Sequence, residues 1–153
     1  MPLKVIIAGA GLGGLGAAIA LARAGHNIEV FEQSRFLNEI GAAIHIAPNA
    51  TRILKSWDID FEELQAVLCN AIKLYDNTGR LLGIPVKLDE LQNKAGNRDE
   101  WLLTHRVDLH TTLRKAATGT AYEDRIKIHT ASKVVAAVST QMWSLHSYLK
   151  LNS

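Results

Sequence analysis

Apolar and polar runs along the first 32 residues follow a pattern typical of a strand, a helix and a second strand. The apolar run at residues 3–8 predicts the first strand. The Ala-rich run at residues 15–24 predicts a helix that ends at Gly25. A second apolar run, residues 28–31, predicts another strand, and Glu32 follows it directly. A glycine-rich turn separates the first strand from the helix, so this part of the chain predicts a βαβ unit.

The remaining pattern predicts shorter elements. Helices are expected at residues 48–57, 60–67 and 106–117, the second of them opened by a capping box at Asp60. Extended segments are expected at residues 41–46, 101–104, 126–128 and 133–138. Residues 72–75 and 81–86 flank Asp-Asn-Thr-Gly, a strong turn signal, and predict a hairpin. The polar residues 88–100 predict an exposed loop.

The glycine-rich turn has the spacing of a dinucleotide-binding motif. Gly9 permits a sharp turn off the strand, Gly11 lets a pyrophosphate approach the backbone, and Gly14 lets the helix lie close to the strands. The helix N-terminus then directs its free amides at the phosphates, while Glu32 is placed to accept hydrogen bonds from a ribose diol. One alternative is a turn without a ligand. A secretory signal peptide is disfavoured by the glycines in its apolar region and by the strand that follows directly.

Composition narrows the classes of partner. The chain has 153 residues, enough for one modest domain, of which 48% are hydrophobic and 21% charged. A net charge of +2 gives no indication of nucleic-acid binding, and no apolar run is long enough for a membrane span. The single Cys69 excludes an internal disulfide and favours a cytoplasmic protein. The histidines lack the spacing of a metal site, and no catalytic triad can be assembled.

Five motifs in order resemble one family. They are Gly9-Ala-Gly-Leu-Gly-Gly-Leu, Val30-Phe-Glu-Gln-Ser, Gly41-Ala-Ala-Ile, Pro48-Asn-Ala and His105-Arg-Val-Asp-Leu. This set is similar to the N-terminal part of the FAD-dependent aromatic-ring monooxygenases, of the salicylate-hydroxylase and para-hydroxybenzoate-hydroxylase type. The resemblance implies an α/β fold with a Rossmann-like FAD-binding domain of the glutathione-reductase type. Part of a substrate-domain sheet would be inserted into it.

The resemblance also implies a cofactor site, with NAD(P)H as co-substrate and a small aromatic or related substrate. Gly9, Gly11, Leu12, Gly13 and Gly14 would hold the FAD pyrophosphate, and Glu32 the ribose of its adenosine half. Residues 41–45, among them Gly41, Ala43 and His45, would bring backbone groups near the flavin half. Arg106 would reach the FAD phosphates, although by spacing alone it reads as a solvated surface arginine. No catalytic side chain is expected, because the reduced flavin activates oxygen in this family.

The chain departs from the family near its C-terminus. The family carries an Asp-Gly motif and a later Gly-Asp motif that binds the ribityl chain, and this sequence has neither. We therefore expect residues 1–135 to be the N-terminal part of the monooxygenase domain, with a substrate-domain segment at about 69–103 and a non-family tail at 136–153. Alternatives are a free-standing Rossmann module for NAD or ADP, and a fragment that does not fold alone. NADP binding would favour a basic residue directly after Glu32, but the first basic residue there is Arg35, three positions later. The sequence therefore disfavours NADP as the ligand.

Overall fold

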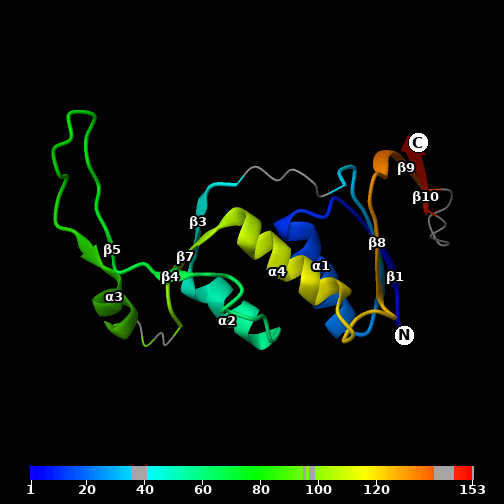
Figure 1. The fold of residues 1–153 in the computed structure, drawn as a ribbon, viewed down its shortest axis with the longest axis horizontal. Coiled ribbons are helices and arrows are strands. Elements are labelled where there is room, and N and C mark those ends of the chain that lie inside the picture. Colours follow the sequence, from blue (N-terminus) through cyan, green and yellow to red (C-terminus); the bar gives the residue numbers. More distant parts are fainter. Residues whose placement is uncertain (36–40, 95, 97–98, 140–146, 153) are drawn as a thin grey trace. The chain divides into compact units, whose positions relative to one another are not determined.

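The computed structural model describes residues 1–35, 41–94, 96, 99–139 and 147–152. The chain divides into two compact units (Figure 1). The first contains the described residues of 1–40 and 110–153, and the second those of 41–109.

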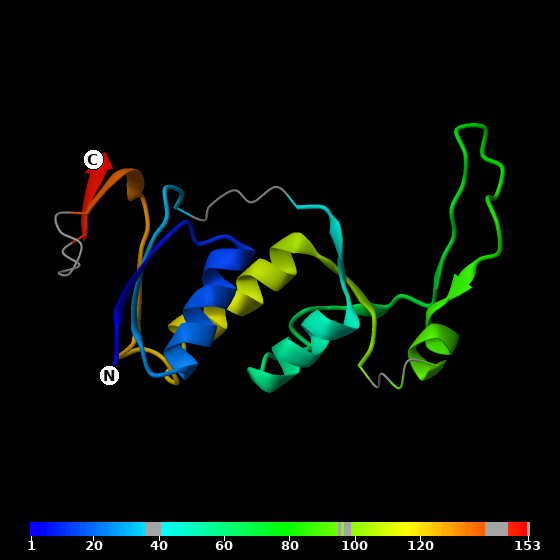
Figure 2. The same cartoon turned by 180° about the vertical axis from the view of Figure 1, so that it is seen from behind.

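A three-stranded parallel sheet forms the base of the first unit. Its strands are β1 (Lys4–Ala8), β2 (Asn27–Phe31) and β8 (Ile126–His129), and β2 lies in the centre. Helix α1 (Leu12–Arg23) connects β1 to β2 and packs against all three strands (Figures 1 and 2). The predicted βαβ unit is thereby confirmed.

The core of this unit lies between the sheet and α1. Along β2, Ile28 and Val30 are buried while Glu29 and Phe31 are partly exposed, which is the alternation of a strand packed on one face. The buried face of α1 consists of Leu15, Ala18, Ile19 and Ala22. Two of these four are alanines, and short side chains let the helix axis approach the strands closely.

An antiparallel pair, β9 (Lys133–Ser139) and β10 (Ser147–Asn152), completes the first unit. Strand β9 was expected, whereas β10 was not. The sequence between the two strands has no Gly, Pro, Asn or Asp, so it lacks the residues that indicate a turn most strongly.

A second sheet is the centre of the other unit. Strand β7 (Leu102–His105) pairs antiparallel with both β3 (Ala43–Ile46) and β4 (Val67–Leu68). Helix α2 (Pro48–Ser56) follows β3, and the longer α4 (Arg106–Thr118) follows β7 directly. From His110 onward, α4 belongs to the first unit.

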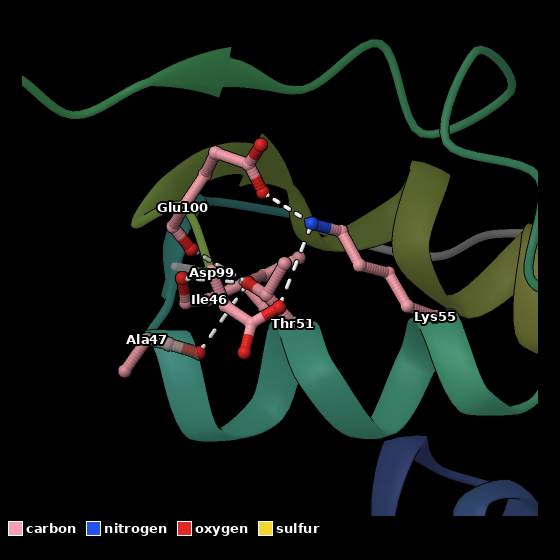
Figure 3. Close-up of polar contacts among 6 residues, drawn as sticks. All are labelled: Ile46, Ala47, Thr51, Lys55, Asp99 and Glu100. Carbon is pink, nitrogen blue, oxygen red and sulfur yellow. Dashed lines mark hydrogen bonds and ion pairs between the residues drawn. The ribbon is translucent and has the colours of Figure 1, made fainter. Parts of the chain in front are cut away.

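A buried hydroxyl joins α2 to the segment before β7 (Figure 3). Thr51 is completely buried and its Oγ1 donates to the carbonyl oxygen of Glu100 at 2.9 Å. Lys55, one helical turn later, pairs through Nζ with the Glu100 carboxylate at 2.5 Å and with that of Asp99 at 3.6 Å. The hydrogen bond from Lys55 lowers the pKa of Glu100, and the same bond raises the pKa of Lys55.

The predicted hairpin is present as an arm of the second unit. Strands β5 (Ala71–Ile72) and β6 (Val86–Lys87) pair antiparallel, and a single bridge joins Tyr75 to Leu81 nearer the turn. Gly79 takes a φ of +83° in that turn, as its Asp-Asn-Thr-Gly context predicts.

Two predictions of secondary structure were wrong. Residues 88–94, expected to be loop, form α3 (Leu88–Lys94), with Asp89 and Glu90 in its first turn and Leu88 buried. Residues 61–65 form turns rather than a helix. Asp60 Oδ1 accepts the amides of Glu62 and Glu63, so the capping interaction forms without a helix to extend it.

Candidate functional site

The turn after β1 has a backbone that requires glycine at two positions. Gly9 has a φ of +99°, which side chains rarely tolerate, and its amide donates to the carbonyl of Phe31 at 2.8 Å. A Cβ on Gly14 would overlap the carbonyl oxygen of Gly9. Glycine is therefore needed at Gly9 for the turn and at Gly14 for the contact of helix with strand, as the motif predicts.

Helix α1 begins directly after this turn. Gly11 is the N-cap, and the first bond within the helix runs from the Leu15 amide to the Gly11 carbonyl at 2.9 Å. The amides of Leu12, Gly13 and Gly14 precede that bond and so have no acceptor within the helix. Cβ atoms on Gly11 or Gly13 would meet nothing within 4 Å, and the first turn contains no acidic side chain. This geometry suits a phosphate group.

Glu32 lies beside the turn and is held by two backbone amides. Its Oε2 accepts from the Ala10 amide at 2.8 Å, and its Oε1 from the Ser34 amide at 2.7 Å. Partial burial acts to raise the pKa of Glu32, but the amides of Ser34 and Ala10 outweigh it, and the pKa lies below its ordinary value. The side chain is therefore ionised at neutral pH, and each oxygen retains a second lone pair for a hydroxyl donor.

A cavity of about 190 Å³ adjoins this carboxylate. The residues that line it are Ala8, Gly9, Phe31, Glu32, Gln33, Lys133 and Val134. Lys133 and Val134 were not among the predicted site residues. They come from β9, about a hundred positions after Glu32, and a valine and a lysine at the start of a strand carry no motif that would reveal them.

The other predicted site residues lie in the second unit. The amide of Arg106 donates to the Ala42 carbonyl at 3.0 Å, and Ala43 pairs with His105 across β3 and β7. A Cβ on Gly41 would overlap the His105 ring, so glycine here has a packing reason of its own. His45 Nδ1 accepts the indole N–H of Trp101 at 3.1 Å.

The predicted residues thus form two groups. One group lies in the first unit and consists of Gly9, Gly11, Leu12, Gly13, Gly14 and Glu32. The other group lies in the second unit, around the β3–β7 pair and the start of α4, and consists of Gly41, Ala43, His45 and Arg106.

In the part of the chain that the structure describes, the His, Cys, Asp and Glu side chains form no cluster of three or more that could hold a metal ion. None of the helices in this part of the chain is long and apolar enough to cross a membrane.

Comparison with known proteins found one matching family model and several relatives by sequence. Residues 7–55 match the family described as NAD(P)-binding Rossmann-like domain. The chain is 38% identical over 117 residues to hispidin-3-hydroxylase of Neonothopanus nambi, an alignment that covers 75% of this chain and 26% of the relative. It is 35% identical to 3-hydroxybenzoate 6-hydroxylase of Polaromonas naphthalenivorans, over 77% of this chain and 30% of the relative.

Solved structures show the same fold. Pseudomonas aeruginosa PqsL, solved in complex with 2-aminobenzoylacetate, superposes with a TM-score of 0.77 at 20% identity and covers 99% of this chain. CtdE, solved with FAD and a substrate, gives 0.72 at 24% identity over 97% of this chain. The chain spans 39% and 34% of those two chains. Together with the sequence relatives, these matches show that the chain has a Rossmann-like fold and is similar to part of the FAD-dependent monooxygenases.

Proposed function

We propose that this chain binds the ADP half of FAD at the turn between β1 and α1. The observation that carries the proposal is the Ala10–Glu32 hydrogen bond of 2.8 Å, which fixes an ionised carboxylate beside an exposed helix N-terminus. Phosphates are anions that a helix N-terminus stabilises, and a ribose diol presents two donors to a carboxylate. One turn thereby offers acceptors to the sugar and donors to the phosphates.

Each of the predicted residues has a part in this proposal. Gly11, Leu12, Gly13 and Gly14 surround the pyrophosphate with backbone amides, and Gly9 sets the turn that exposes them. Glu32 holds the ribose, and the cavity that Lys133 and Val134 help to line receives the adenine. Arg106 reaches the phosphates, while the segment that contains Gly41, Ala43 and His45 contacts the flavin half with backbone groups.

The whole protein is proposed to hydroxylate a small aromatic substrate with NAD(P)H and oxygen. When bound, FAD supplies the electron transfer and the activation of oxygen, so the protein has to bind, orient and exclude water. The relatives include three named hydroxylases and four named FAD-dependent monooxygenases. Residues 1–135 would be the part of the monooxygenase domain present here, with residues 69–103 its substrate-domain segment.

A second candidate is a Rossmann module that binds NAD or ADP without catalysis. The family match over residues 7–55 favours it, because that family is described as NAD(P)-binding. Both candidates use the same turn and the same carboxylate, and they differ in which dinucleotide binds more tightly.

Calorimetric titration of the 153-residue chain with FAD, ADP, NAD and NADP separates the candidates. The proposal expects FAD and ADP to bind, NAD to bind more weakly, and NADP to bind least, since its 2′-phosphate would face the ionised Glu32. A clear preference for NAD over FAD would favour the module. Failure of all four nucleotides to bind would refute both.

A further inference from the structure

His110 is a buried polar side chain close to the glycine-rich turn. It lies in α4, is only 3% exposed, and belongs to the same unit as the glycine-rich turn. Its Nε2 is 2.7 Å from the carbonyl oxygen of Ala10. A carbonyl oxygen only accepts, so Nε2 carries a hydrogen and donates it.

Ala10 is thereby held through both of its peptide groups. Its amide, which belongs to the Gly9–Ala10 peptide, donates to Glu32, and its carbonyl, which belongs to the Ala10–Gly11 peptide, accepts from His110. Ala10 itself is completely buried. A side chain from a distant helix therefore fixes the turn at the residue between its first two glycines.

The orientation of one peptide has a consequence for the next amide. A trans peptide is planar, and its C=O and N–H point in opposite directions. Because the Ala10 carbonyl is directed at His110, the Gly11 N–H is directed away from His110. Donation to a carbonyl also polarises its peptide, which makes the N–H on the other side a stronger donor. Gly11 is exposed and a Cβ there would meet nothing, so a ligand can approach this amide.

We propose that His110 is a positioning residue for the nucleotide phosphates, because its bond to the Ala10 carbonyl aims the Gly11 N–H at them. This inference rests on the proposed binding of the ADP half of FAD. Its effect reaches the phosphates through the Ala10–Gly11 peptide, whereas the carboxylate that holds the ribose bonds to the Gly9–Ala10 peptide.

Calorimetry of the 153-residue chain with ADP and with adenosine tests the proposal. His110→Leu removes the donor and retains an apolar side chain of similar bulk. It should weaken ADP binding by about tenfold, the effect of losing one net hydrogen bond and the aim of a second, and leave adenosine binding within about twofold. His110→Gln places an amide N–H close to the Nε2 position and should restore most of the ADP affinity. His110→Asn is too short to reach and should not.

The outcomes are distinguishable. Equal losses for ADP and adenosine in His110→Leu would show a merely structural role and overturn the inference, as would unchanged ADP affinity. If His110→Leu fails to fold by circular dichroism, the Gln and Asn variants decide, and equal ADP affinities in that pair overturn it. If the unaltered chain binds neither ADP nor adenosine, the proposed function itself fails.

Discussion

Replacing Glu32 with alanine removes the acceptor for two backbone amides and, on the proposed function, the group that binds the ribose. The Ser34 amide is exposed and can bond to water, but the Ala10 amide belongs to a completely buried residue and loses its partner. One buried amide without a partner destabilises a fold by about 1–3 kcal/mol. Loss of the ribose contact should weaken ADP binding by about 1–3 kcal/mol, roughly 5- to 150-fold.

Calorimetric titration with ADP and 2′-deoxy-ADP measures the ribose contact directly. The unaltered chain should bind 2′-deoxy-ADP more weakly than ADP, whereas Glu32→Ala should bind the two alike. Glu123→Ala, which changes an exposed acid in the same unit, serves as the matched control and should leave both affinities unchanged. The reasoning is refuted if Glu32→Ala binds ADP as tightly as the unaltered chain, or still distinguishes the two nucleotides while remaining folded.

Three further results are expected. Gly14→Ala should lower the unfolding free energy by about 1–3 kcal/mol in urea titration, because the added Cβ overlaps the Gly9 carbonyl. Gly13→Ala should be neutral or stabilising, because a Cβ at that position meets no other atom within 4 Å. Equal effects of the two substitutions would contradict the packing argument. Thr51→Val should lower the unfolding free energy by about 1–3 kcal/mol in the same assay, since the completely buried Thr51 hydroxyl no longer donates to the partly buried Glu100 carbonyl at 2.9 Å. Unchanged stability would show that the bond contributes nothing. The pKa of Glu32 lies below its ordinary value of 4.5, so ionised Glu32 stabilises the fold above pH 4.5, and this stabilisation is lost as the pH falls through the folded-state pKa. The difference in unfolding free energy between the unaltered chain and Glu32→Ala should therefore shrink in acid. A difference that stays constant with pH would refute the assignment.

The 153-residue chain alone should show little or no monooxygenase activity. Productive hydroxylation needs the flavin ring enclosed and the substrate positioned, and this chain spans about a quarter to two fifths of the length of the proteins it resembles. Substrate-dependent oxidation of NAD(P)H with a matching yield of hydroxylated product would contradict this expectation.

The sequence alone determined the parts of the molecule that depend on neighbours along the chain. The strand, turn, helix and strand of the first 32 residues followed from hydrophobic period and glycine spacing, and the structure has them at β1, α1 and β2. These features are local: a φ of +99° at Gly9 or a clash at Gly14 excludes other residues whatever the rest of the chain does. Local sequence signals also correctly predicted that Pro48 begins α2 and that Gly79 lies in the hairpin turn.

Only the tertiary structure decided which distant residues meet that turn. His110 reaches the Ala10 carbonyl across a hundred positions, and Lys133 and Val134 complete the cavity beside Glu32. Asp60 shows the converse, because a local capping signal was present there and no helix followed. Capping satisfies only the first amides of a helix, and most helical stability comes from burying an apolar face against the fold, which no window of sequence contains.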